Sequence, residues 1–187
     1  MKVSVEVAGW EIECCVPPPG VGDRVSWPLE FHSGEVDPDG FDRAAPDSRW
    51  WRAERRDDGA VLLVDGPLVA YWSTYRHPAP EPGVLEATGV LSATLHGGSA
   101  PVDLPAVSGR VRRLWVRSQV YVPVIGKGTR YRGPVAGTLE LREVDRSPRW
   151  FSSGPPSAEG PERIAIGLLV ELGIDEAAGH RPDQTAS

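Results

Sequence analysis

Glycine and proline interrupt this chain so often that long helices are excluded. The 187 residues include 21 Gly and 19 Pro, about a fifth of the chain. Proline breaks helices because it lacks an N–H group and clashes with the preceding turn, and glycine weakens them through its conformational freedom. The hydrophobic fraction of 40% and the charged fraction of 25% are ordinary for a globular protein. The sequence therefore predicts short strands joined by turns, and it excludes a coiled coil or global disorder.

Short segments of alternating polarity support this prediction. Val3, Val5 and Val7 alternate with polar residues, which is the pattern of a half-buried strand. Further strands are expected at residues 24–31, 61–64, 68–72, 85–96, 107–124, 135–144 and 164–172, the last of which also fits a helix. The predicted fold is mainly β, a single-domain antiparallel β-barrel or two-sheet sandwich with long loops. We expect the domain to span residues 1–172, followed by a polar, disordered tail at 173–187.

Two segments are less regular. In residues 10–15, Trp10, Ile12 and Cys14 share one parity, which predicts a second strand paired with the first as a hairpin. Residues 32–58 are rich in Gly, Pro, Asp and Arg. We expect a long mobile loop there, with a short helical turn near residues 48–54.

The location is inferred from what the sequence lacks. No apolar run approaches the roughly 18 residues of a membrane span, and the N-terminus does not resemble a signal peptide. Two adjacent cysteines without a secretion signal indicate a reducing compartment. We therefore expect a cytoplasmic protein without a membrane partner. Its 18 Arg against 2 Lys are typical of a bacterial genome rich in GC.

Charge is unevenly distributed along the chain. The net charge is −6, but residues 105–150 carry +7 and the remainder −13. A basic block in an acidic protein favours an anionic partner. The alternative is a self-neutralising fold, in which basic strands pair with acidic loops.

One face of the predicted strand at 111–122 combines cations with aromatic rings. It carries Arg113, Trp115, Arg117, Gln119 and Tyr121, with Leu114, Val116, Val120 and Val122 on the core face. Arginine neutralises phosphate, and aromatic rings stack on bases. This face is the candidate binding surface for nucleic acid or another polyanion. The alternatives are an exposed face held by cation–π and cross-strand pairs, or a Trp115 buried against the long loop.

A second candidate surface is the pair Trp50 and Trp51. Two adjacent Trp side chains on a strand cannot both enter one core. One of them caps the core, or the loop presents the pair to a protein partner.

The adjacent cysteines Cys14 and Cys15 allow several chemistries. Zinc would need further ligands, for which His32, His77 and His96 are candidates, but none has the usual spacing. A vicinal disulfide switch and a thiol nucleophile with a His base are further alternatives. The simplest interpretation is one buried thiol packed like Ala and one partly exposed thiol. We expect no catalytic residue, no bound metal and no cofactor.

Several motifs resemble those of a known family. Trp10, the Cys14-Cys15 pair and Val21-Gly22-Asp23-Arg24-Val25-Ser26-Trp27 are similar to the opening of an uncharacterised family of small bacterial proteins. Residues 146–151, Arg-Ser-Pro-Arg-Trp-Phe, resemble a later part of the same family. The resemblance implies a domain of unknown function and assigns no catalytic residue. The function favoured by the residues themselves is that of a non-enzymatic binding module, with a metal- or thiol-dependent enzyme as the least favoured alternative.

Overall fold

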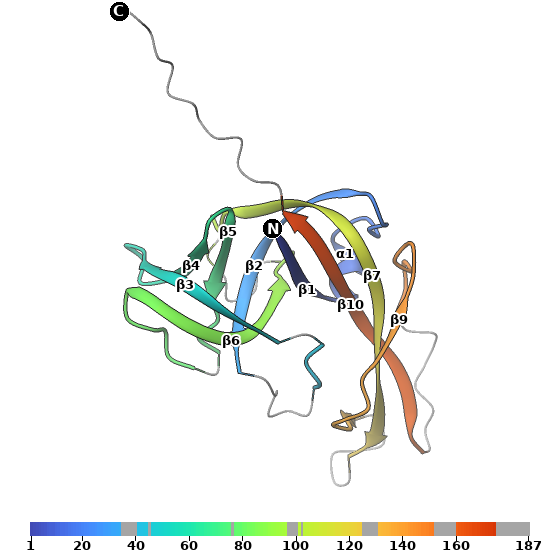
Figure 1. The fold of residues 1–187 in the computed structure, drawn as a ribbon. Coiled ribbons are helices and arrows are strands. Elements are labelled where there is room, and N and C mark those ends of the chain that lie inside the picture. The colour runs from blue at the N-terminus through green and yellow to red at the C-terminus, as the bar shows by residue number, and fades with distance from the viewer. Residues whose placement is uncertain are drawn as a thin grey trace, which may run out of the picture.

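The computed structural model describes residues 1–34, 41–44, 46–75, 77–96, 101, 103–124, 131–151 and 160–174. The fold is mainly β, as predicted, with one short helix (Figure 1). The elements are β1 (Lys2–Ala8), α1 (Gly9–Cys14), β2 (Arg24–Ser33), β3 (Asp47–Arg55), β4 (Val61–Asp65), β5 (Leu68–Trp72), β6 (Gly83–Ala93), β7 (Ala106–Pro123), β8 (Arg132–Pro134), β9 (Glu140–Glu143) and β10 (Glu162–Ile174). The predicted tail beyond residue 174 lies outside the described residues, as do Lys127 and Arg130 of the basic block.

All ten strands belong to one mixed sheet whose pairings run in closed circuits. One circuit follows β1, β6, β2, β7 and β10, and β10 pairs again with β1. A second circuit follows β6, β3, β4, β5 and β2, and it shares the β2–β6 pair with the first. Two pairs, β1–β6 and β2–β5, are parallel, and the others are antiparallel.

One hydrophobic core connects both circuits. Its buried members come from every long strand and from the helix, and they include Val5, Ile12, Leu29, Leu63 and Leu168. The alternation in the sequence explains this arrangement, because every second residue of a strand points to the same side. In β1 the three valines at alternating positions are all buried, as the pattern predicts.

Strand β7 is the longest element, and in the first circuit it pairs with both β2 and β10. In Figure 1 it curves over β2 and then descends beside β10. Residues 106–110 pair with β2, and residues 109–121 pair with β10. The register shifts opposite Glu171 and Leu172, so Arg112 and Arg113 are both exposed while Leu114 is buried. The strand is thus continuous, but the side that it buries changes along its length.

The prediction of a hairpin strand at residues 10–15 is wrong, because residues 9–14 form α1. Glu11 and Ile12 are adjacent and both buried, whereas Trp10 is 55% exposed. A strand would point these two neighbours to opposite faces, and a helical turn lets both face inward. The alternation of large and polar side chains over only six residues therefore did not identify the element.

The long loop predicted at 32–58 is wrong at residues 32–33 and 47–55, which lie in strands, whereas residues 41–44 and 56–58 lie outside any helix or strand. Residues 47–55 form β3, which pairs with β4 and β6, and no helical turn occurs among them. Trp51 and Ala53 point inward, with exposed fractions of 2% each, while Trp50 is 63% exposed. The flanking charged residues are the solvent side of a strand, which composition alone did not distinguish from a loop.

The predicted strand at 164–172 is confirmed as part of β10. The expected strand at 135–144 is shorter in the structure, where only residues 140–143 form β9. Among the described residues, no helix has the length and apolar character needed to cross a membrane.

The two tryptophans of β3 provide a matched test of the core. Trp51 packs edge-to-face on Phe31, with ring centroids 5.6 Å apart. We expect Trp51→Ala to lower the free energy of unfolding by about 3–5 kcal/mol, because it leaves a large cavity. Trp50→Ala removes an exposed ring and should change the same quantity by less than about 0.5 kcal/mol. Urea titrations of both variants measure the difference, and equal losses would contradict the placement of Trp51 in the core.

Candidate functional site

A buried ion pair joins β1 to β7 at the base of the candidate site. Arg117 donates to Glu6 over 3.0 Å, and both side chains are less than 10% exposed. Arg43 lies 3.6 Å from the same carboxylate, and the backbone N–H of Ala44 donates to it over 2.7 Å. Burying ions costs free energy unless they are paired and hydrogen bonded. The segment 41–44 therefore completes a charge cluster that the two strands begin.

Asp42 clamps this segment to the loop before β9. Its carboxylate accepts the backbone N–H groups of Gly137, Thr138 and Leu139, each over 2.9 Å. Its backbone carbonyl accepts a hydrogen bond from Arg117 over 3.1 Å. One residue thus holds two loops together above β7.

Gln119 extends the same network and is fully buried. Its side-chain oxygen accepts the N–H of Asp42 over 3.3 Å, and its amide nitrogen donates to the carbonyl of Val135 over 3.0 Å. Buried amides are stable when their donors and acceptors are satisfied in this way. Gln119 therefore acts as a structural link between the two loops.

A pocket of about 590 Å³ opens between this network and α1. That volume lies within the range of roughly 300–1,000 Å³ that is typical of small-molecule sites. The lining residues are Glu6, Ala8, Trp10, Glu11, Glu30, Phe41, Arg43, Ser92, Ala93, Thr94, His96, Arg117, Tyr121 and Ile166. They combine aromatic rings, small side chains and charged groups of both signs.

Arg117 is a buried charged group in the lining of this pocket. Burial lowers the pKa of its guanidinium, and Glu6 opposes that shift by favouring the charged form. Its Nε atom is buried and has no hydrogen-bond partner among the described residues. An unpaired buried donor costs about 1–3 kcal/mol, so the protein groups described here do not fully satisfy the guanidinium of Arg117.

The aromatic members of the lining form two ring pairs. Phe41 and Tyr121 meet edge-to-face with centroids 6.4 Å apart, and burial raises the pKa of the Tyr121 hydroxyl. Trp10 meets the ring of His96 edge-on at 5.5 Å. The pocket thus has an aromatic pair beside the ion cluster and an aromatic pair beside the helix.

Glu11 attaches the helix to the chain that follows β6. Its carboxylate accepts the N–H of Leu95 over 2.8 Å and is also hydrogen bonded to the backbone of His96. Burial raises the pKa of Glu11, and these backbone donors lower it in part. The position of His96 is therefore set by a buried carboxylate of α1.

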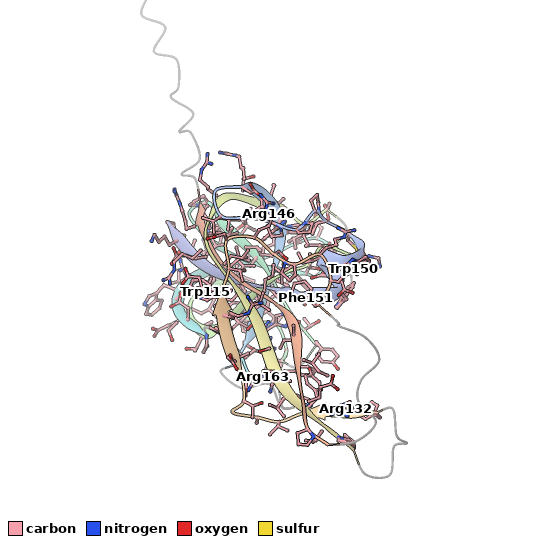
Figure 2. All side chains as sticks on the ribbon, turned by 90° about the vertical axis from the view of Figure 1, so that its right-hand side faces the viewer. Trp115, Arg132, Arg146, Trp150, Phe151 and Arg163 are labelled. Atoms are coloured by element: carbon pink, nitrogen blue, oxygen red, sulfur yellow. A yellow bond between two sulfur atoms is a disulfide. The ribbon has the colours of Figure 1, made fainter. Side chains whose placement is uncertain are left out.

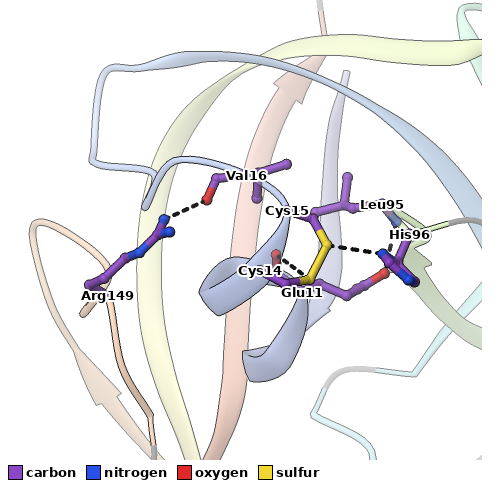
Figure 3. The surroundings of a disulfide bond; sticks show 7 residues. All are labelled: Glu11, Cys14, Cys15, Val16, Leu95, His96 and Arg149. Carbon is purple, nitrogen blue, oxygen red and sulfur yellow. Dashed lines mark hydrogen bonds between the residues drawn. A yellow bond between two sulfur atoms is a disulfide. The ribbon is translucent and has the colours of Figure 1, made fainter.

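The adjacent cysteines are bonded to each other. Cys14 and Cys15 form a vicinal disulfide at the end of α1 (Figure 3), so the interpretation of one buried and one partly exposed thiol is wrong. Nδ1 of His96 lies 3.1 Å from Sγ of Cys15. The ligand atoms of these three residues lie within 4.8 Å of one another. Because both sulfur atoms are in a disulfide, they offer no thiolate to a metal in this state.

The other histidines proposed as ligands lie elsewhere. The Nε2 atom of His32 is 2.8 Å from the hydroxyl of Ser92 and 3.8 Å from Glu30. His77 is exposed and is not part of the three-residue cluster. Of the candidate histidines, only His96 is brought to the cysteines.

The predicted face of β7 is not a continuous open surface. Arg117 and Gln119 are buried beneath the loops described above, and Tyr121 is half-buried in the pocket. The predicted core face is correct at Leu114 and Val116, but Val120 and Val122 are only partly buried. The physical reason is that segments 41–44 and 135–139 cover the face of β7 that carries Arg117 and Gln119.

The accessible remainder of that face is Arg113 and Trp115. Figure 2 shows Trp115 on the side of the molecule that β7 and β10 form. The guanidinium of Arg113 lies 4.6 Å from the Trp115 ring and donates two hydrogen bonds to Glu143 of β9. Nucleic-acid binding through this face stays a prediction, as does partner binding at Trp50, whereas Trp51 is buried in the core.

Sequence reasoning did not single out most of the pocket residues. Glu6 occupies the polar parity of β1, which predicts exposure, and only the covering loop buries it. Glu11 and Trp10 were assigned to a strand, and Phe41 and Arg43 to a loop. No local signal in the sequence identifies these residues, because their roles depend on segments far apart in the chain.

Comparison with known proteins identifies a family. The model of a family of unknown function, DUF6578, matches residues 1–174, so the chain belongs to that family. This confirms the predicted resemblance to a domain of unknown function. No curated protein and no solved structure matches the chain.

The clamp by Asp42 can be tested directly. We expect Asp42→Ala to lower the free energy of unfolding by about 1–3 kcal/mol, because three backbone donors lose their acceptor. Hydrogen exchange at residues 137–139 should accelerate in the same variant. Asp57→Ala, at an exposed turn, is the matched control. Unchanged exchange at residues 137–139 would argue against the clamp.

Glu11 should give the stability a characteristic pH dependence. Its pKa is raised above 4.5 by burial, so folding favours the protonated form. The contribution of Glu11 to the free energy of unfolding is fully present below the ordinary pKa of a glutamate. It is lost as the pH rises through the raised pKa of the folded protein. We therefore expect wild type to lose stability relative to Glu11→Gln as the pH rises above 4.5, the ordinary pKa of a glutamate, towards neutral pH. Denaturant titrations across this range, with the exposed Glu81→Gln as control, measure the effect, and a difference independent of pH would refute it.

Proposed function

We propose that this member of the DUF6578 family is a non-enzymatic binding module that holds a small organic molecule in the pocket between β1, β7 and α1. The observation that carries the proposal is a pocket of about 590 Å³ whose lining includes Arg117, a buried residue whose Nε donor has no partner among the described residues. Buried donors are nearly always satisfied in folded proteins. A ligand with an acceptor group at that position would satisfy this one.

The lining residues indicate the chemistry of the ligand. The lining contains two guanidinium groups, Arg43 and Arg117, and three carboxyl groups, Glu6, Glu11 and Glu30. This balance does not favour a multiply charged anion. A ring that packs against Trp10 or Phe41, joined to one acidic and one basic group, fits both the aromatic and the charged walls.

The proposal includes the architecture and the location. Of the two architectures that the sequence left open, the closed circuit of β1, β6, β2, β7 and β10 supports the barrel, and such barrels hold ligands at their mouths. The proposed location is the bacterial cytoplasm, an expectation that rests on the composition.

A second candidate function is protein–protein interaction through Trp50. Its ring is 63% exposed. Val84 of the neighbouring strand β6, which pairs with Arg52, is 73% exposed. Trp51 cannot take part directly, because it is buried in the core. This candidate therefore depends on Trp50 and its neighbours on β6.

Three compounds that share an indole ring but differ in charge test ligand binding by the pocket. The probes are tryptophan, which is a zwitterion, indole-3-acetate, which is an anion, and tryptamine, which is a cation. We expect tryptophan to bind most tightly in calorimetric titrations, since it matches both signs of charge. Arg117→Met should weaken its binding at least about tenfold, which corresponds to the loss of one charge-assisted hydrogen bond.

Two further variants keep this experiment decisive. Arg113→Met removes an arginine from the same strand outside the pocket and should leave binding unchanged. Thr94→Trp narrows the pocket but retains the pair of Arg117 with Glu6, and it should abolish binding in a folded protein. Equal binding by wild type and Thr94→Trp would refute the pocket. Salt-sensitive binding of single-stranded DNA that is lost in Arg113→Ala/Trp115→Ala would favour the strand face instead.

A further inference from the structure

The disulfide of Cys14 and Cys15 has no evident stabilising role. A disulfide stabilises a fold mainly by closing a long loop of the unfolded chain, and its effect grows with the length of that loop. Here the two residues are adjacent in sequence, so the bond constrains almost none of the chain. Its location is also exposed at Cys14, outside the hydrophobic core. A chemical role explains the bond better than a structural one.

The two sulfur atoms have different neighbours. Sγ of Cys15 lies 3.1 Å from Nδ1 of His96, and Sγ of Cys14 lies 3.8 Å from the carbonyl oxygen of Glu11 (Figure 3). A protonated imidazole stabilises a thiolate, whereas a carbonyl oxygen accepts a hydrogen bond from a thiol and disfavours the thiolate. After reduction, Cys15 is therefore the better thiolate and Cys14 the better thiol.

His96 is held in place from two sides. The carboxylate of Glu11 binds the backbone of Leu95 and His96, and the ring of Trp10 packs edge-on against the imidazole. The contact of the imidazole with Cys15 therefore exists before any reaction. Such preorganisation lets His96 stabilise charge as it develops on the sulfur.

We propose that Cys14–Cys15 is a thiol–disulfide exchange site whose substrates are dithiols, with Cys14 as the attacked sulfur and Cys15 as the leaving group. The thiolate of the dithiol attacks Sγ of Cys14, the bond between Cys14 and Cys15 breaks, and its electron pair stays on Cys15 beside His96. The second thiol loses its proton to solvent and attacks the substrate sulfur of the mixed disulfide, which releases Cys14. The dithiol is oxidised to its disulfide, and the cysteine pair gains two electrons and two protons. The direction of attack follows from the general rule that the thiol with the lower pKa leaves faster.

The proposal does not depend on what the pocket binds. His96 also lines the pocket, but the exchange step uses only the disulfide, the imidazole and an external dithiol. A protein that exchanges thiols but binds none of the indole probes would refute the pocket and retain this site. The opposite result would refute this site and retain the pocket.

The first test measures the rate of reduction. Full-length protein purified without reductant is mixed with dithiothreitol at pH 7, quenched with N-ethylmaleimide at set times, and analysed by intact mass. We expect His96→Asn to be reduced about tenfold more slowly than wild type, because the leaving thiolate loses its partner. His77→Asn removes a histidine outside the cluster and should react at the wild-type rate. Equal rates for His96→Asn and wild type would overturn the proposal, as would two alkylated cysteines before any reductant is added.

The second test identifies which of the two cysteine sulfur atoms an external thiol attacks. Glutathione, a monothiol, forms a mixed disulfide that acid quenching traps, and fragmentation of the peptide containing both cysteines identifies the modified sulfur. We expect the adduct on Cys14 in wild type. In His96→Asn the preference for Cys14 should fall. An adduct predominantly on Cys15 in wild type would overturn the assignment of the leaving group.

Discussion

The buried ion pair of Glu6 and Arg117 is the interaction on which the structure around the pocket depends. Two charges cannot be removed from water at this depth unless their remaining hydrogen-bonding groups also find partners. The pair therefore requires segment 41–44, which supplies Arg43 and two backbone groups. Asp42 in turn binds the loop before β9. One electrostatic requirement thus brings two distant loops onto β7 and forms one wall of the pocket.

The opposite wall depends on a second buried carboxylate, that of Glu11. It binds the chain after β6 and places His96 against both the pocket and the disulfide. A six-residue helix is suited to this task, because adjacent side chains of a helix can be buried together while the next cysteines reach the surface. The pocket and the proposed exchange site therefore share α1, although their proposed chemistries are separate.

Much of the fold follows from local patterns. Alternation over β1, β2 and β7 identifies these strands, because a strand that is buried on one face needs apolar residues at every second position. Strands β4 and β5 are instead short apolar runs separated by the turn signal Asp65-Gly66-Pro67. The same rule fails over residues 10–15, where six residues are too few to separate a strand from a helical turn. It also fails over β3, where charged residues on the solvent face and in the flanking chain resemble a loop. The site is less predictable than the fold, since Glu6 and Arg117 each occupy a position that alternation assigns to solvent.

The sequence by itself determined that the chain is mainly β, that it belongs to a family without assigned function, and that its basic residues concentrate after residue 105. These properties depend on composition, periodicity and motifs, which are local. Only the tertiary structure decided which charges are buried, which of two adjacent tryptophans enters the core, and that His96 meets a bonded pair of cysteines 81 residues away. The physical reason is that burial and pairing depend on contacts between segments distant in sequence, and those contacts exist only once the chain has folded.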